Sequence, residues 1–197
     1  MKKNVRSNTP QEIRINSGRL RGRKLTFPSV EGLRPTLGRS RETLFNWLRP
    51  SLPDATCLDL FAGSGVLGME AASVGAAQVV LVEQHAETAK HLAHSIDTLD
   101  LGDICSLEIA DARSFLGRCH SSFDVIFVDP PFADNGLLET AVTAICESRL
   151  ISDGKRSAAK TRLESGKIDQ GRQHPKLACS GPITKQILRL HARLQMH

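Results

Sequence analysis

Residues 58–68 read LDLFAGSGVLG and combine an apolar strand, a glycine-rich loop and the start of a helix. Three glycines, Gly63, Gly65 and Gly68, follow the strand pattern at spacings of two and three residues. Glycines allow a ligand to approach the backbone closely, and the N-terminus of the following helix offers unpaired N–H groups. A strand, a glycine loop and a helix in this order predict a site for a nucleoside cofactor.

Strand and helix patterns alternate on both sides of this stretch. Uniformly apolar strand patterns cover residues 56–61, 79–83, 104–109 and 124–128, and helical patterns cover residues 65–74, 86–99 and 137–148. Apolar strands separated by helices are typical of a parallel sheet with helices on both faces. We therefore expect an α/β fold built around a mainly parallel sheet.

Two acids bear on which cofactor the loop suits. Glu83 lies twenty residues after Gly63, at the end of the next strand pattern, where a carboxylate can accept hydrogen bonds from both ribose hydroxyls. The glycine spacing also matches dinucleotide-binding proteins, but Asp59 at the tip of the first strand would repel a pyrophosphate and attract the ammonium of a methionine moiety. Asp59 could instead cap the loop or the helix, and both roles stay open.

A second motif, Asp129-Pro130-Pro131-Phe132, follows the strand pattern of residues 124–128 directly. Two prolines restrict the backbone and remove N–H donors, so the carbonyl groups there are left as acceptors. A carboxylate and a rigid carbonyl can accept both hydrogens of an exocyclic amine and direct its lone pair at an electrophile, while Phe132 offers a face for a planar base. The alternative is a rigid turn with Phe132 packed in the core.

Charge is strongly segregated along the chain. The formal net charge of +5 divides into +9 for residues 1–50, −12 for residues 51–154 and +8 for residues 155–197. Residues 13–25 have a strand or hairpin pattern that carries five basic side chains, Arg14, Arg19, Arg21, Arg23 and Lys24, of which the last four lie within six residues. Such a surface attracts phosphates irrespective of base sequence. The alternative is a solvated face on an edge hairpin.

A helix is expected over residues 36–48, before Pro50 and Pro53. Its spacing separates an apolar face from a polar one. The apolar face is predicted to hold Thr43, Leu44, Trp47 and Leu48, and the polar face Arg39, Arg41 and Glu42.

Composition argues against several classes of protein. The longest apolar stretches are about half of the roughly 20 residues that cross a bilayer, and no apolar segment follows the basic N-terminus as in a secretory signal. Five cysteines lack CxxC or Cys/His ligand spacing, so we expect no disulfide framework, no metal site and a cytoplasmic location. Cys57, Cys105 and Cys146 are expected to be small core residues.

The chain resembles one methyltransferase family from residue 13 to about residue 154. The resemblance is carried by Arg14-Ile15 with Gly18, Arg21-Gly22-Arg23-Lys24-Leu25, Gly32-Leu33-Arg34-Pro35-Thr36, Arg41-Glu42-Thr43-Leu44-Phe45-Asn46-Trp47-Leu48, residues 58–72 and residues 128–132. The glycine loop and the DPPF motif are shared by many amino-methyltransferases that use S-adenosylmethionine, whereas the RGRKL and RPT…RETLFNWL segments are specific to this family. It is the RsmD-type family, whose members methylate guanine N2 in small-subunit ribosomal RNA.

The resemblance implies a Rossmann-like class I methyltransferase fold with a small basic hairpin at its N-terminus. It implies that the methionine part of S-adenosylmethionine is held by Asp59, Phe61, Ala62, Gly63 and Gly65. Glu83 then binds the ribose, Asp111 contacts the adenine amine, and the amine of the target guanine is held by Asp129, Pro130, Pro131 and Phe132. Thr36 and Arg41 fall in the segment that closes over the cofactor and helps to position RNA, which Arg34 is also expected to contact.

The implied reaction is direct attack of the guanine amine on the sulfonium methyl group, with catalysis by positioning and electrostatics. The expected partner is 16S ribosomal RNA or an assembling 30S ribosomal particle, with an unstacked target base. We expect a monomer that does not associate with membranes. A catalytically impaired RNA-binding relative, a DNA amino-methyltransferase and an NAD enzyme with the same glycine spacing stay open as alternatives.

The C-terminal part departs from the family after residue 154. The sequence KRSAAK at residues 155–160 replaces an apolar, aromatic strand, and residues 181–188 match the last family strand only loosely because they contain Pro182 and Lys185. Residues 183–194 fit either a strand or a basic helix. We therefore divide the chain into a basic N-terminal extension (1–50), a methyltransferase core (51–154) and a divergent C-terminal segment (155–197).

Overall fold

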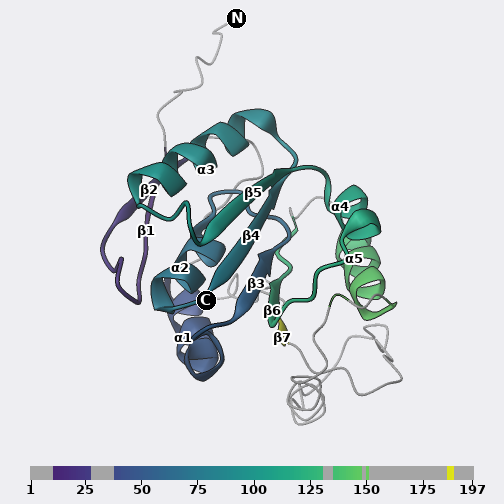
Figure 1. The fold of residues 1–197 in the computed structure, drawn as a ribbon, viewed down its shortest axis with the longest axis horizontal. Helices are drawn as coiled ribbons and strands as arrows, with labels where there is room; N and C mark the ends of the chain where they lie inside the picture. Colours follow the sequence, from purple (N-terminus) through teal and green to yellow (C-terminus); the bar gives the residue numbers. More distant parts are fainter. Residues whose placement is uncertain (1–10, 28–37, 131–134, 148–149, 151–185, 189–197) are drawn as a thin grey trace, which may run out of the picture.

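Parallel strands form the centre of the structure, a computed structural model that describes residues 11–27, 38–130, 135–147, 150 and 186–188 (Figure 1). Among these residues, one sheet has the strand order β5-β4-β3-β6-β7, with every neighbouring pair parallel. Its strands are β3 (Thr56–Asp59), β4 (Gln78–Glu83), β5 (Cys105–Ile109), β6 (Val125–Phe127) and β7 (Gln186–Leu188). The chain adds β4 and β5 on one side of β3 and β6 and β7 on the other. The switch point of the sheet therefore lies between β3 and β6, where such folds bind ligands.

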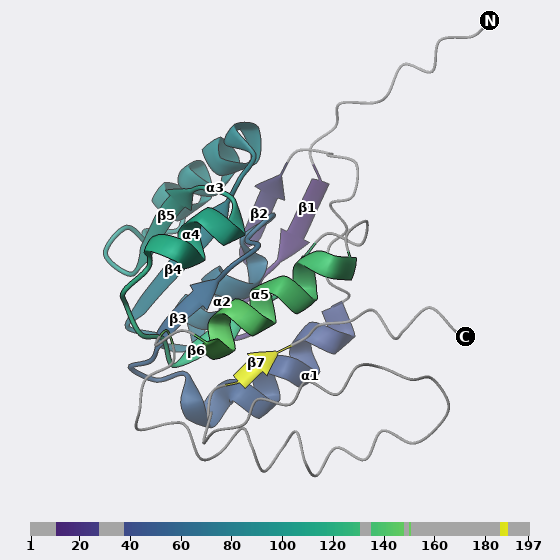
Figure 2. The same cartoon turned by 90° about the vertical axis from the view of Figure 1, so that its right-hand side faces the viewer.

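Helices cover both faces of this sheet (Figures 1 and 2). One face is covered by α1 (Gly38–Leu48), α2 (Val66–Val74) and α3 (Ala86–Thr98), and the other by α4 (Ala112–Arg118) and α5 (Asn135–Glu147). Successive strand residues alternate between the two cores, so Cys57 packs with α1 to α3 whereas Leu58 packs with α4 and α5. The expected α/β architecture is confirmed.

An antiparallel hairpin precedes the sheet along the chain. It consists of β1 (Gln11–Arg14) and β2 (Lys24–Phe27), in which Ile13 lies opposite Leu25. The buried side chains of Ile13, Leu25 and Phe27 belong to the same hydrophobic core as α1 to α3, and β2 contacts α3. The apolar side of the hairpin is thus part of the central core. The division of the chain into three domains stays a prediction.

Helix α1, followed by the short helix η1 (Arg49–Ser51), buries a different face from the expected one. Its two predicted leucines are buried, but Thr43 and Trp47 are exposed, Trp47 to 59%. Phe45 lies in the interior instead, with its ring centroid 6.0 Å from that of Phe127 in β6. Arg41, one turn before Phe45, is buried too. The prediction was wrong because it took Trp47 as the core aromatic and every arginine as solvated.

Several remaining expectations can be compared with the structure. Residues 186–188 form a strand parallel to β6, while residues 155–185, where the family pattern breaks down, lie outside the described residues. Cys57 and Cys105 are buried as expected, and burial raises the pKa of Cys105 to about 12; the side chain of Cys146 is outside the description. Helix α4 has no counterpart among the expected elements. No helix in the described ranges is long and apolar enough to cross a membrane.

Candidate cofactor and catalytic site

The glycine loop between β3 and α2 lies against the end of β4. Gly63 and Gly65 adopt left-handed φ angles of 52° and 75°, which glycine tolerates without strain. The amide of Ala62 donates to the Val82 carbonyl at 2.9 Å, and the amide of Gly65 donates to the Ala62 carbonyl at 2.7 Å. A Cβ on Gly65 would lie 2.4 Å from Cδ2 of Leu92 in α3, so a side chain there would displace Leu92. The loop is therefore held tightly against both neighbours.

Asp59, the last residue of β3, is buried beside this loop. Its Oδ2 accepts a hydrogen bond from the amide of Gly68, in the first turn of α2, at 3.0 Å; its Oδ1 has no hydrogen-bond partner among the described residues. Burial raises the pKa of Asp59 to about 7; interactions with the backbone amides of Gly68 and Phe61 oppose this shift, and the carboxylates of Asp129 and Glu83 add to it. Asp59 thus holds the first turn of α2 with one oxygen and keeps acceptor capacity on the other.

Glu83, the last residue of β4, connects the glycine loop to the strand. Its Oε2 accepts from the Gly63 amide at 3.0 Å, and its Oε1 accepts from the His85 amide at 2.7 Å. Each carboxylate oxygen can accept a second hydrogen bond, so these contacts leave capacity for the hydroxyls of a ribose. The structure brings Glu83 and the loop together, as the spacing predicts.

Asp111 follows β5 and is exposed, on the first turn of α4. Its Oδ1 accepts from the amides of Arg113 and Ser114, both at 3.1 Å, which makes Asp111 the N-cap of this helix. Hydrogen bonds from Ser114 and then from the Arg113 amide lower the pKa of Asp111. The predicted contact with an adenine amine stays a prediction, and it would use the second carboxylate oxygen.

Asp129 and Pro130 follow β6 at the same edge of the sheet. β6 pairs directly with β3, in a register that sets Asp59 opposite Phe127. Both Asp129 and Pro130 are half-buried, and the charge of Asp129 is close enough to Asp59 to raise its pKa. The structure therefore brings the first residue of the second motif next to the cofactor loop. Four predicted site residues lie outside the described residues: Arg34, Thr36, Pro131 and Phe132.

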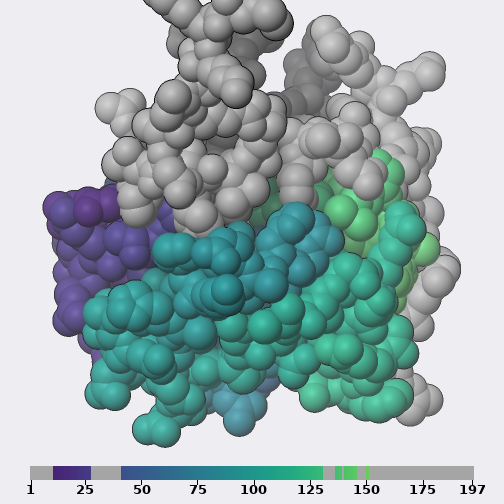
Figure 3. Space-filling view, turned by 90° about the horizontal axis from the view of Figure 1, so that it is seen from above, coloured from purple at the N-terminus to yellow at the C-terminus, as the bar shows by residue number. Residues whose placement is uncertain are grey.

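Four predicted basic residues are exposed on the hairpin or on the segment between its strands: Arg19, Arg21, Arg23 and Lys24. Nη2 of Arg23 donates to the Thr98 carbonyl at the end of α3 at 3.2 Å, and Lys24 forms an ion pair with Glu12 at 2.7 Å. The guanidinium groups of Arg19 and Arg21 have no hydrogen bond or ion pair with any described residue. Figure 3 shows the hairpin, in purple, at one end of the molecular surface and α5, in green, at the other.

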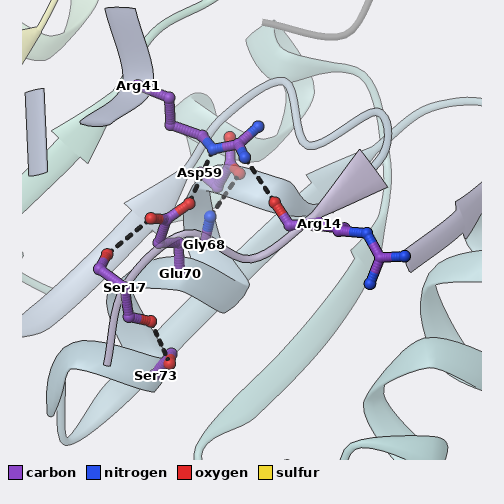
Figure 4. Close-up of polar contacts among 7 residues, drawn as sticks. All are labelled: Arg14, Ser17, Arg41, Asp59, Gly68, Glu70 and Ser73. Atoms are coloured by element: carbon purple, nitrogen blue, oxygen red, sulfur yellow. Dashed lines mark hydrogen bonds and ion pairs between the residues drawn. The ribbon is translucent and has the colours of Figure 1, made fainter. Parts of the chain in front are cut away.

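Arg41 does not lie on the surface, so the expected contact with RNA is wrong for this side chain. Its side chain is 2% exposed, its Nε lies 2.7 Å from Oε2 of the fully buried Glu70, and its Nη2 donates to the Arg14 carbonyl (Figure 4). Burial lowers the pKa of Arg41 and raises that of Glu70, and each partner opposes the shift of the other. A buried carboxylate requires a counter-charge, and Arg41 supplies it.

Sequence reasoning missed Glu70. It stands within the otherwise apolar and small residues of α2, all of them buried up to Ser73. An acid in such a helix faces the core and needs a cation, which was the available signal.

The comparisons with known proteins agree with this geometry. A family model described as "Conserved hypothetical protein 95" matches residues 13–173. The chain is 42% identical over 166 residues to "Ribosomal RNA small subunit methyltransferase D" of Escherichia coli strain K12, covering 84% of this chain and 82% of that protein. The namesake from Haemophilus influenzae is 44% identical over 155 residues, covering 75% and 78%. This chain belongs to the RsmD-type methyltransferase family.

Solved structures also resemble this member of the RsmD-type family. The Escherichia coli protein yhhF has a TM-score of 0.67 and 44% identity, with 73% of this chain and 77% of that chain covered. HI0767 from Haemophilus influenzae has a TM-score of 0.61 and 38% identity, with 72% and 77% covered. The class I methyltransferase fold implied by the sequence resemblance is confirmed.

In this RsmD-type chain three acids gather at the site. Asp59, Glu83 and Asp129 follow or end the adjacent strands β3, β4 and β6, and both other carboxylates act on the pKa of Asp59. A buried oxygen without a partner, between like charges, favours a cationic ligand and disfavours a pyrophosphate. In the described part of the chain, no group of three or more His, Cys, Asp or Glu residues could hold a metal ion.

Proposed function

We propose that this protein transfers a methyl group from S-adenosylmethionine to the exocyclic N2 amine of a guanine in 16S ribosomal RNA. The observation that carries the proposal is the closeness of Asp59 and Asp129, which brings the glycine loop and the second motif together at the switch point of the sheet. The relatives named ribosomal RNA small subunit methyltransferase D support the RNA substrate.

The described acids fit the charge of the cofactor. When bound, S-adenosylmethionine supplies an electrophilic methyl group on a sulfonium, and it also carries an ammonium. The unpartnered Oδ1 of Asp59 accepts a hydrogen bond from that ammonium, and the combined charge of the acids favours the cation. Glu83 accepts hydrogen bonds from the ribose. The further cofactor contacts in the proposal are Phe61, Ala62, Gly63 and Gly65 to the methionine part, Asp111 to the adenine amine, and Thr36 in the closing segment.

The second motif holds the acceptor base. The carboxylate of Asp129 and a backbone carbonyl of the motif accept the two hydrogens of the guanine amine, which directs the nitrogen lone pair at the methyl group. Pro130 and Pro131 keep this backbone rigid, and Phe132 stacks on the base. As the N–C bond forms, the S–C bond to the methyl group breaks, S-adenosylhomocysteine leaves and the amine nitrogen loses one proton. The enzyme forms no covalent intermediate, because positioning and electrostatic orientation of the amine lower the barrier.

The basic hairpin binds the RNA backbone in this proposal. Exposure of Arg19 and Arg21, whose guanidinium groups are not engaged by described residues, supports phosphate contacts that act irrespective of sequence. Arg23, Lys24 and Arg34 are proposed to contribute to the same surface. We also propose that the protein acts as a monomer in the cytoplasm, on naked 16S ribosomal RNA or on an assembling 30S particle.

Labelled S-adenosylmethionine tests the reaction directly. We expect incubation with 16S ribosomal RNA or 30S particles from a strain lacking the modification to place the label on the N2 of one guanine. Asp129→Ala should abolish transfer but still allow S-adenosylmethionine to bind, because Asp59, Glu83 and the glycine loop are intact. Asp97→Ala, at an exposed position on α3, is the matched control and should retain transfer. Cofactor binding without transfer would favour the impaired relative, and transfer to DNA alone would contradict the RNA substrate.

A further inference from the structure

A buried polar network connects the hairpin to α2, the helix that follows the glycine loop (Figure 4). Its central residue is Glu70, whose Oε2 lies 2.7 Å from Nε of Arg41 and whose Oε1 accepts a hydrogen bond from Oγ of Ser17 at 2.6 Å. Arg41 also donates to the carbonyl of Arg14 at the end of β1. One carboxylate therefore holds both α1 and the segment that follows β1.

Ser73, one turn further along α2, holds the same segment. Its Oγ donates to the Ser17 carbonyl at 2.6 Å and accepts from the Leu20 amide at 2.8 Å, while its carbonyl accepts from the Arg19 amide at 2.8 Å. Gly18, between them, has a φ angle of 76°, and a Cβ there would lie 2.0 Å from the Ser73 carbonyl oxygen. The segment rests directly on the backbone of α2.

Stability alone is a weak explanation for such a network. The desolvation of a buried ion pair offsets most of its attraction, and well-packed apolar residues often stabilise a protein as much. A buried ion pair fixes the relative position of two segments more effectively than it stabilises the fold, since moving one partner leaves the other charge buried and unpaired. The network fixes the segment that carries the exposed Arg19 and Arg21 on α2. The N-cap of α2 is Gly65 of the glycine loop, so the network also fixes these arginines relative to that loop.

We propose that Glu70 and Ser73 are positioning residues: they fix residues 17–23, the basic turn, relative to the glycine loop. RNA phosphates bound by Arg19 and Arg21 then bring the acceptor base to the methyl group in a single register. Neither Glu70 nor Ser73 contacts the reacting atoms, and both act through the basic turn. This inference rests on the proposed function and adds to it the part of the fold that relates RNA binding to methyl transfer.

Ser73→Ala tests the inference without leaving a charge unpaired, and Ser17→Ala is a second variant that loses only the hydroxyl bound to Glu70. We expect near wild-type affinities for S-adenosylmethionine and for 16S ribosomal RNA, because the loop and the arginines are intact. The single-turnover rate at saturating RNA and cofactor should fall roughly 10- to 100-fold, since small misplacements of a reactant have effects of that order. Ser95→Ala, at a buried serine of α3, is the matched control and should keep the wild-type rate.

A double-mutant cycle separates positioning from a general loss of stability. In the wild type, replacing Arg19 and Arg21 by alanine should lower both RNA affinity and the single-turnover rate. In the Ser73→Ala background the same replacements should lower affinity equally but change the rate little further, because the arginines no longer set the register. A folded Ser73→Ala protein with the wild-type rate, or rate effects that simply multiply, would overturn the inference.

Hydrogen exchange without substrate distinguishes failure of the positioning role from failure of the proposed function. Ser73→Ala should accelerate exchange of the Leu20 amide, while the Gly68 amide, bonded to Asp59, keeps its protection. Absence of methyl transfer to RNA by the wild type would overturn the proposed function and this inference with it. Transfer by the wild type, together with unchanged Leu20 exchange in Ser73→Ala, would overturn the positioning role alone.

Discussion

At the scale of single residues, Asp59 combines helix capping with the charge of a ligand site. Its pKa is raised from 3.8 to about 7, first of all by burial. The folded chain therefore retains a proton that the unfolded chain has lost, and the stability contributed by the neutral carboxyl declines as the pH rises from about 4 to about 7. A bound cation has the opposite preference, since it favours the ionised carboxylate.

This linkage predicts a pH-dependent cofactor affinity. Binding of S-adenosylmethionine should strengthen with pH, by up to about tenfold for each unit below 7, and should level off above that value. Asp59→Asn cannot titrate, so its affinity should be weaker and nearly independent of pH. Calorimetric titration between pH 5.5 and 7.5 measures both proteins, and an equal slope in the variant would assign the effect to another group.

Asp111 illustrates how one side chain can serve an element and a ligand. Asparagine caps helices about as well as aspartate, whereas alanine does not. We therefore expect Asp111→Ala to lower the free energy of unfolding and Asp111→Asn to leave it nearly unchanged. If the carboxylate also binds the adenine amine, Asp111→Asn should weaken cofactor binding. Urea unfolding measures the capping role and calorimetry measures cofactor binding. Unchanged binding in Asp111→Asn would show that Asp111 acts only as a helix cap.

At the scale of elements, two glycines of the hairpin segment differ in what surrounds them. Gly18 and Gly22 both have positive φ angles, 76° and 86°, but a Cβ on Gly22 would meet nothing within 4 Å. Gly22→Ala should therefore destabilise by about 1–2 kcal/mol through its backbone conformation. Gly18→Ala adds a clash with the backbone of α2 and should cost about 1–3 kcal/mol more. Urea unfolding measures both; equal losses would show that the hairpin segment does not rest tightly on α2.

Periodicity and motif spacing predicted most elements but not every face. The strands and the glycine loop could be found because apolar runs and glycine spacing are local properties, and Glu83 and Asp129 followed from their places at strand ends. The buried face of α1 could not, because Arg41 is stable in the interior only through Glu70, a residue 29 positions away. Helix α4 was missed because it is short and because the family resemblance gave its N-cap residue, Asp111, a role in ligand binding.

At the scale of the whole molecule, the charge divides between two parts of the fold. Asp59, Glu83 and Asp129 lie at the carboxyl ends of the central strands, while the exposed Arg19, Arg21 and Arg23 lie on the hairpin segment. Binding of RNA should therefore weaken with salt, because phosphate contacts release counterions. The ion pair of Arg41 with Glu70 should not contribute to this salt dependence, because both side chains are buried.

Individual arginines should contribute separately to that salt dependence. Arg19→Ala and Arg21→Ala should each reduce the slope of log affinity against log salt by about one. Arg118→Ala is the control, since Arg118 of α4 is also basic and exposed but is paired with Glu108 of β5. Filter binding of 16S ribosomal RNA across a salt series measures the slopes, and an equal reduction in the control would show a non-specific effect of net charge.

The exposed indole on α1 has a practical consequence. Trp47 is the only tryptophan of a chain that has no tyrosine, and it is 59% exposed. Fluorescence excited at the long-wavelength edge of the aromatic absorption therefore comes from Trp47, at one point on the molecular surface. Because that indole is already exposed to water, denaturation should change its emission maximum little. A partner that covers α1 should instead shift the emission maximum to shorter wavelength and protect the indole from quenchers. Trp47 is therefore an intrinsic fluorescence probe for binding at α1 and a poor probe for unfolding.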